Sequence, residues 1–167
     1  MENILVNGIN YQIVKLLGKG KGGYSYLALK DNKYFVVKQI HHEPCEYYNF
    51  GNKIESENND YKRLLETGIA LPKMIDIDFE NERIVKEYID GPTISQLVEE
   101  KKDINKYVEQ VLEMQKLCKA KNLNIDYYPT NFVVQNEQIY YIDYECNLYD
   151  PKWDYDNWGR QYWIIKT

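Results

Sequence analysis

The chain has few of the features that mark a secreted, zinc-binding or membrane-spanning protein. Its three cysteines, Cys45, Cys118 and Cys146, are odd in number, lie far apart and include no Cys-x-x-Cys pair. This pattern argues against a disulfide framework and a zinc site, and we expect reduced thiols in a cytoplasmic protein. No apolar run approaches the roughly 20 residues of a membrane-spanning helix. The first ten residues have no apolar signal-peptide core, so we expect neither export nor a membrane partner.

An excess of basic residues is also missing. The chain carries 21 Lys and Arg against 26 Asp and Glu, and the net charge of −5 argues against a nucleic-acid partner. What is plentiful is tyrosine, with 17 residues among 167. So many aromatic rings indicate either a stacking surface for sugars or bases, or bulky packing in the core and at its rim. The length suits one domain made of two small lobes.

The first half alternates between β-prone runs and turns. We expect a helix over 53–67 that ends before Gly68, a residue type suited to the position after a helix. Asp90-Gly91-Pro92 marks a boundary between the two lobes. Strands are predicted over 11–17, 24–30, 33–40, 75–79 and 83–89, the last two forming a hairpin.

A glycine run, Gly18-Lys19-Gly20-Lys21-Gly22-Gly23, joins the first two of these strands. A dinucleotide-binding fold would place a helix directly after it, but Tyr24–Leu29 has no helical period. A P-loop would need Gly-Lys-Ser/Thr, which is missing. What remains is a strand–loop–strand flap whose backbone, at Gly18, Gly20 and Gly23, folds over phosphates because no side chains intervene. The alternative is a flexible hairpin turn.

Lys38 and Glu57 are predicted to form an ion pair. Lys38 directly follows four β-prone residues, Tyr34–Val37, within the third predicted strand, where a lysine can also be simply solvated. On the expected helix, Glu57 lies at i+3 from Ile54 and i−4 from Tyr61, within the apolar stripe. A carboxylate that faces inward needs a cationic partner, and Lys38 is the candidate.

The second half ends in a hairpin of polar residues. Helices are expected over 93–101 and over 103–121, the second with Asp103 as N-cap. Short strands over 132–134 and 139–142 should pair antiparallel and bring Asn131 and Asp143 together, with Asp126 just before them. Two acids and an amide suit an oxygen-ligated Mg²⁺ that holds phosphates. The alternative is that Asp126 and Asp143 cap turns.

The order of these motifs over residues 12–160 resembles the protein-kinase-like superfamily. The stretch Leu17–Ala28 is similar to its glycine flap and Phe35-Val36-Val37-Lys38 to its lysine strand. Glu87–Gly91 resembles the hinge that contacts adenine, and Asp126-Tyr-Tyr-Pro-Thr-Asn131 resembles the catalytic loop. Ile142–Glu145 resembles the Ile-Asp-Phe/Trp-Glu of the small-molecule and atypical branches, among them aminoglycoside, choline and RIO-type kinases.

The resemblance implies an α+β bilobal fold. Its N-lobe, 1–89, would hold an antiparallel sheet and one helix, and its C-lobe, 90–167, would be shortened and mainly helical. ATP and Mg²⁺ would be the cofactors, with Glu87 and Ile89 at adenine. The implied roles are phosphate binding by Lys38, orientation of Lys38 by Glu57, Mg²⁺ binding by Asn131 and Asp143, and proton acceptance by Asp126.

Four departures from the superfamily's pattern leave the function open, one of them the short stretch of 12 residues between Asp143 and Asp156. Asn124 replaces a histidine, Tyr128 stands where protein kinases have a lysine, and Lys86 occupies the position behind adenine. The leading interpretation is a phosphotransferase that acts on a hydroxyl group, as Ser/Thr kinases do. The alternatives are a pseudokinase that binds nucleotide or a partner protein, and a small-molecule kinase. The acceptor hydroxyl stays unidentified, and a partner protein could complete the short C-lobe.

Overall fold

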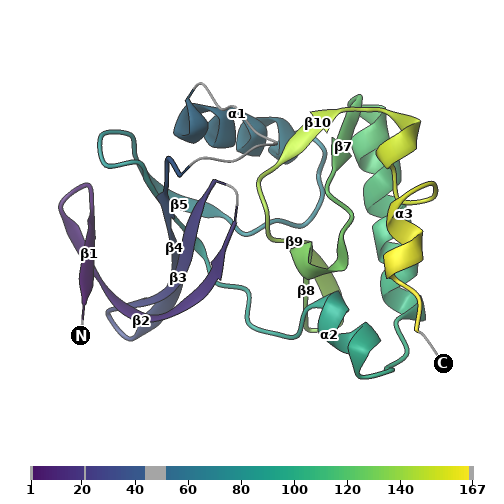
Figure 1. The fold of residues 1–167 in the computed structure, drawn as a ribbon, viewed down its shortest axis with the longest axis horizontal. Helices are drawn as coiled ribbons and strands as arrows, with labels where there is room; N and C mark the ends of the chain where they lie inside the picture. The colour runs from purple at the N-terminus through teal and green to yellow at the C-terminus, as the bar shows by residue number, and fades with distance from the viewer. Residues whose placement is uncertain (1, 21, 44–51, 166–167) are drawn as a thin grey trace. The chain divides into compact units, whose positions relative to one another are not determined.

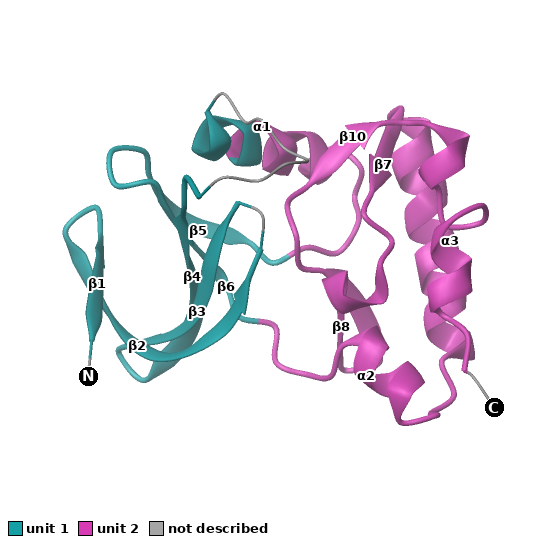
Figure 2. Ribbon diagram, viewed as in Figure 1, with its two compact units in different colours: residues 1–57, 72–88 teal, residues 58–71, 89–167 magenta. Residues whose placement is uncertain are grey.

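The computed structural model describes residues 2–20, 22–43 and 52–165, and Cys45 lies outside them. The structure is α+β, with a curled antiparallel sheet and few helices (Figure 1). The chain divides into two compact units (Figure 2). Unit 1 comprises residues 1–57 and 72–88, and unit 2 comprises residues 58–71 and 89–167.

Unit 1 is built on a six-stranded sheet with the strand order β1-β2-β3-β4-β6-β5. Every pair of neighbouring strands is antiparallel. The predicted strands and the β5–β6 hairpin are confirmed, while β1 was not predicted. The strands are β1 (Asn3–Val6), β2 (Ile9–Lys19), β3 (Gly23–Lys30), β4 (Lys33–Ile40), β5 (Met74–Asp78) and β6 (Arg83–Glu87).

Hydrogen bonds join the two edges of this sheet. Asn7, in the turn between β1 and β2, donates its backbone N–H to Asp78 Oδ2 at 2.9 Å and its amide to the carbonyl of Ile77 at 2.9 Å. Asp78 is 3% exposed. It also accepts from the backbone and the side chain of Asn81, and these donors lower its pKa to about 2. The curled sheet encloses a core of Ile4, Val6, Tyr11, Ala28, Val37 and Val85.

Helix α1 (Lys53–Leu65) contributes its first residues to unit 1 and the remainder to unit 2. Ile54 is buried against Ile40 and Ile84 of the sheet. Leu64, near the other end of the helix, is buried in the core of unit 2. The helix ends two residues earlier than expected, because the backbone turns through Gly68, whose φ of +81° suits glycine.

Unit 2 packs two helices against short strands. The helices are α2 (Ile94–Glu99) and α3 (Asn105–Ala120). The strands form two antiparallel pairs, β8 (Phe132–Gln135) with β9 (Gln138–Tyr141), and β7 (Leu123–Ile125) with β10 (Cys146–Leu148). The β8–β9 hairpin was predicted, and the β7–β10 pair was not. Single 3-10 turns cover Pro129–Asn131, Pro151–Trp153 and Gly159–Tyr162.

The prediction that Asp103 is the N-cap of α3 is wrong by one position. The N-cap is Ile104, which has no side chain able to cap. Asp103 nevertheless accepts the backbone N–H of Asn105 at 2.9 Å through Oδ1. The carboxylate therefore binds one of the helix's first N–H groups from outside the helix.

Tyrosine contributes strongly to the packing. Five tyrosines are at most 2% exposed and lie in the interior of the two units: Tyr11, Tyr127, Tyr141, Tyr144 and Tyr155. In unit 2, Trp163 contacts the rings of Phe132 and Tyr155 and donates its indole N–H to the carbonyl of Tyr127 at 2.8 Å. For these residues the packing interpretation of the aromatic richness is supported.

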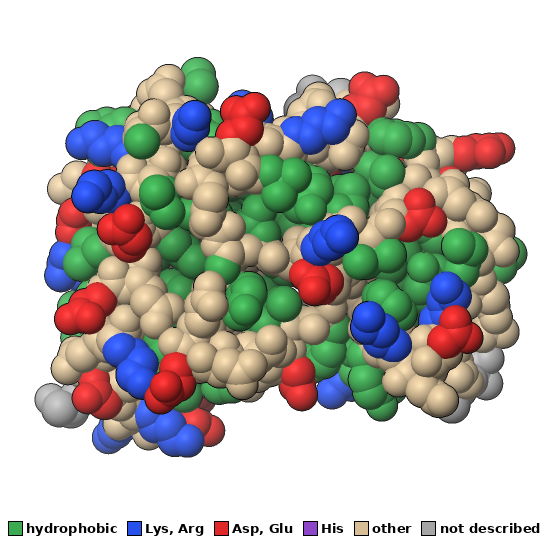
Figure 3. Space-filling view, turned by 180° about the vertical axis from the view of Figure 1, so that it is seen from behind, with side chains coloured by type: hydrophobic (Ala, Val, Ile, Leu, Met, Phe, Trp, Pro, Cys, Tyr) green, Lys and Arg blue, Asp and Glu red, His purple; other side chains and the backbone are tan. Residues whose placement is uncertain are grey.

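Cys118 and Cys146 are buried free thiols, and burial raises the pKa of each to about 12. Within the part of the chain that is described, no helix has the length and hydropathy needed to cross a membrane. Acidic and basic side chains are interspersed over the face shown in Figure 3.

Candidate functional site

The predicted ion pair between Lys38 and Glu57 is present in unit 1. Lys38 lies on β4, between Ser25 of β3 and Ile84 of β6 in the ladder. Glu57 lies on α1, one turn after Ile54, whose burial against the sheet turns this face of the helix inward. Lys38 Nζ contacts Glu57 Oε1, and the two side chains are only 15% and 13% exposed.

The glycine run forms a tight hairpin beside Lys38. The β2–β3 ladder continues to the pair Lys19 and Tyr24, and Gly20 donates its N–H to the carbonyl of Gly23 at 2.9 Å. A Cβ on Gly23 would lie 2.5 Å from the carbonyl oxygen of Gln39 and 3.0 Å from Lys38 Cε. Glycine is needed there because Gln39 and Lys38 of the neighbouring strand β4 leave no room for a side chain. At Gly22, a Cβ would lie 3.8 Å from the Lys38 ammonium.

Residues after β4 hold this hairpin in place, which the sequence did not reveal. The His41 ring contacts the carbonyl of Gly20 through Nε2 at 2.8 Å. The backbone N–H of His41 donates to the carbonyl of Gly22 at 3.1 Å. Glu43 forms an ion pair with Lys19 at 2.9 Å and accepts from the Tyr24 hydroxyl. The glycine hairpin is therefore bound at its tip and along its side.

The other residues expected near adenine lie at the end of β6 and just after it. Lys86 lies on β6, the strand between β4 and β5 in the sheet, and is 8% exposed. Glu87 is exposed, and its Oε1 accepts the backbone N–H of Lys73 at 2.6 Å. Ile89 is half-buried and belongs to unit 2. Glu87 thus has a structural contact, and its expected role at adenine stays a prediction.

In unit 2, the β8–β9 hairpin places the predicted metal ligands at its open end. Phe132 pairs with Tyr141, and the next bond runs from the Ile142 N–H to the carbonyl of Asn131 at 2.9 Å. Asn131 is therefore opposite Ile142, the residue before Asp143. Asn131 also donates its amide N–H to the carbonyl of Asp126 at 3.3 Å. This bond determines which end of the amide is the oxygen that could ligate a cation.

Tyr141 links these segments through hydrogen bonds, a role that no sequence pattern predicted. Its hydroxyl donates to the carbonyl of Glu145 at 2.7 Å and accepts the backbone N–H of Asp126 at 3.1 Å. Burial raises the pKa of Tyr141 well above its usual value, and the negative charge of Asp143 raises it further. Its hydroxyl therefore stays protonated and can make both hydrogen bonds.

Asp126 also has a local structural role. Its Oδ1 accepts the backbone N–H of Tyr128 at 3.1 Å, a turn-capping contact of the kind that the alternative describes for Asp126. This bond orients the carboxylate, which is half-buried. Among the described residues, no three His, Cys, Asp or Glu side chains converge on a metal site. A cation here would need Asp143, the Asn131 amide oxygen, and oxygens from its ligand or water.

No family model and no curated protein matches this chain. The geometry of each unit is therefore the basis for a function. Unit 1 offers a cation beside a narrow glycine hairpin, which suits the binding of an anion such as phosphate. Unit 2 offers carboxylate and amide oxygens, which suit a divalent cation and the proton of a hydroxyl.

Proposed function

We propose that this chain is an ATP–Mg²⁺-dependent phosphotransferase with a protein-kinase-like fold. The observation that carries the proposal is the largely buried ion pair between Lys38 and Glu57, next to Gly22 and Gly23. Burying two opposite charges seldom adds stability over apolar residues of similar size. A function that needs an oriented ammonium explains the pair better than stability does.

In this proposal unit 1 binds the phosphates of ATP. The Lys38 ammonium neutralises α- and β-phosphate oxygens, and Glu57 holds it in position. The glycine hairpin, including Gly18, Gly20 and Gly23, contributes backbone that can approach phosphates closely. The hinge after β6, with Glu87 and Ile89, contacts adenine through its backbone.

Unit 2 performs the transfer. Asp143 and Asn131 would hold Mg²⁺, which would supply positive charge to balance that of the transferred group. The acceptor's hydroxyl oxygen attacks the γ-phosphorus and the bond to the β-phosphate oxygen breaks, with ADP as the leaving group. The hydroxyl proton passes to the carboxylate of Asp126, which the Tyr128 N–H orients.

One observation favours a second candidate, a nucleotide-independent scaffold. Lys86 occupies the position that lies behind adenine in the superfamily, and its side chain is 8% exposed. A buried cation there fits poorly with the apolar slot that a purine ring requires. The two candidates differ in whether ATP binds at all.

The test measures nucleotide binding and transfer separately. Millimolar ATP with Mg²⁺ should raise the melting temperature, because ligand at 100 times its Kd adds about 2.7 kcal/mol of stability. Asp143→Asn should remove the metal-dependent part of this shift, whereas Asp126→Asn should keep it and stop transfer of label from γ-labelled ATP. Asp31→Asn, in an exposed turn, is the matched control. The absence of any shift in the wild type would favour the scaffold.

A further inference from the structure

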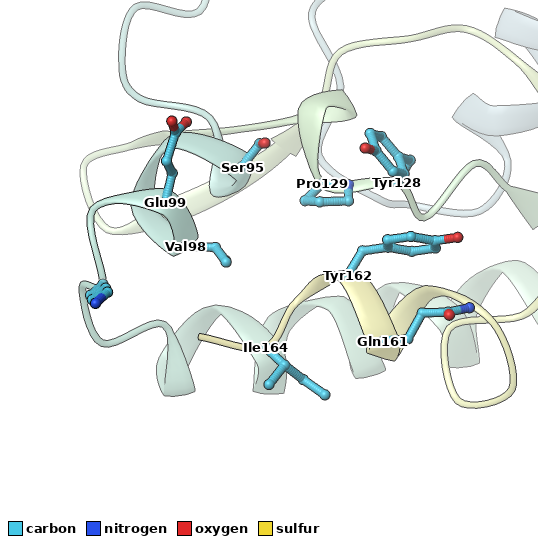
Figure 4. Close-up of a pocket in the computed structure, with 9 residues that line it drawn as sticks. Ser95, Val98, Glu99, Tyr128, Pro129, Gln161, Tyr162 and Ile164 are labelled. Carbon is cyan, nitrogen blue, oxygen red and sulfur yellow. The ribbon is translucent and has the colours of Figure 1, made fainter. Parts of the chain in front are cut away.

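A pocket of about 240 Å³ lies within unit 2, between helix α2 and the 3-10 turns Pro129–Asn131 and Gly159–Tyr162. Tyr128 and Tyr162 form one side, with ring centroids 5.0 Å apart and an interplanar angle of 60°. Figure 4 shows the two rings on the side opposite Ser95 and Val98 of α2. Both tyrosines keep much of their surface exposed, 42% and 38%.

Two of the residues that line the pocket, Tyr128 and Pro129, follow closely after Asp126 in the sequence. The N–H of Tyr128 donates to Asp126 Oδ1 at 3.1 Å, and the same residue supplies a ring to the pocket wall. Pro129, which follows, is buried and also lines the pocket. The carboxylate proposed to accept the proton is thus hydrogen-bonded to the backbone of a residue whose side chain lines the pocket, although Asp126 itself is not part of the lining.

The size of the pocket limits what it can hold. Pockets for drug-sized ligands measure about 300–1,000 Å³. At about 240 Å³, this pocket suits one ring or one short chain. The tyrosine rings offer flat apolar surface of the kind on which the C–H face of a saturated ring packs.

The polar lining indicates a neutral ligand with several hydroxyl groups. The two charged residues, Glu99 and Lys101, are of opposite sign, so the lining has no net charge to select an ion. The Ser95 hydroxyl and the Gln161 amide can both donate and accept hydrogen bonds. A ligand with hydroxyl groups matches donors and acceptors together. A cation can also pack on tyrosine rings, but the lining has no excess of carboxylate to favour a cation over a neutral ligand.

We propose that this pocket binds the phosphate acceptor, and that the acceptor is a neutral, hydroxyl-rich molecule about the size of a monosaccharide. The proposal rests on the proposed phosphotransfer and names the substrate class of that reaction. The pocket holds the ring by packing on Tyr128 and Tyr162 and leaves one hydroxyl group for Asp126.

Ligand-observed NMR without nucleotide tests the binding step. Glucose, ribose and myo-inositol are the neutral probes, and choline is the cationic comparison. At least one neutral probe should show saturation transfer from the full chain, and choline should show none. Tyr162→Leu, which removes one ring, and Ser95→Leu, which fills the pocket, should each weaken binding at least tenfold. Tyr34→Leu is the control, since Tyr34 is an exposed tyrosine of unit 1.

The outcomes separate this proposal from the proposed function. Melting temperatures with ATP and Mg²⁺ are measured on the same samples, and they also show that each variant is folded. An ATP-dependent shift with no binding of any neutral probe overturns the acceptor proposal and leaves the phosphotransferase standing. Binding of choline alone, or binding unchanged in both pocket variants, also overturns it. Polyol binding in the pocket without any response to ATP overturns the phosphotransferase and the acceptor role together.

Discussion

Removing one or both charges of the Lys38–Glu57 ion pair tests whether the pair is present for function or for stability. Glu57→Leu leaves the Lys38 ammonium largely buried with less negative charge beside it. Lys38→Met has the converse effect on the Glu57 carboxylate. The double variant removes both charges and replaces them with side chains of similar size. If the pair is retained for function, the double variant should be more stable than either single variant.

The burial of the pair gives the expected magnitudes. Breaking a fully buried ion pair costs about 3–5 kcal/mol. The side chains here are 15% and 13% exposed, so some hydration remains. We therefore expect about 2–3 kcal/mol for each single variant, and a double variant within about 1 kcal/mol of the wild type. Lys33→Met, at an exposed position on the same strand, should change stability by less than about 0.5 kcal/mol.

Urea unfolding gives the free energies, and the thermal shift with ATP and Mg²⁺ gives binding. The double variant should fold normally and lose the shift, while Lys33→Met keeps it. A double variant as unstable as the sum of the two single variants would show that the pair contributes no coupling. A double variant that keeps the full ATP response would refute the role of Lys38 at the phosphates.

Three further predictions concern other contacts. Asp78 has a folded pKa of about 2, below its usual 3.8, so its stabilising effect is complete above about pH 4 and is lost as the pH falls towards 2. Acid unfolding of Asp78→Asn should lack this dependence. Gly23→Ala should cost about 1–3 kcal/mol in urea unfolding, because its Cβ would lie 2.5 Å from the Gln39 carbonyl. Gly18→Ala, where a Cβ meets nothing within 4 Å, should be nearly neutral. Tyr141→Phe should cost about 1–3 kcal/mol, since both hydrogen bonds of its buried hydroxyl are lost, and a neutral result would contradict its linking role.

Features that depend on neighbouring residues could be predicted from the sequence. The β-prone runs flanking the glycines and the hairpin after Asn131 have strong local patterns, and both are present. The inward position of Glu57 followed from helical spacing alone. Its partner could be named because Lys38 was a cation already expected on a strand.

Features that depend on residues far apart in the sequence could not be predicted from it. Strand β1 covers only Asn3–Val6, and the contacts that close the sheet join Asn7 to residues about 70 positions away. The β7–β10 pair has three residues in each strand and a separation of some 20 residues, too little for a periodic pattern. The N-cap of α3 was misplaced because Asp103 makes the hydrogen bond typical of a cap from one residue further out.

The two groups of candidate residues, one in each unit, therefore depend on the sequence in different ways. Asp126, Asn131 and Asp143 are positioned by short connections, one hairpin and the hydroxyl of Tyr141. Lys38 meets Glu57 only because Ile54 packs its helix against the sheet. Substitutions in the apolar core under α1 should therefore reduce nucleotide binding through Lys38, whereas the geometry of the second group should depend chiefly on Tyr141. Ile54 and Tyr141 thus position candidate residues, although the proposed chemistry uses neither.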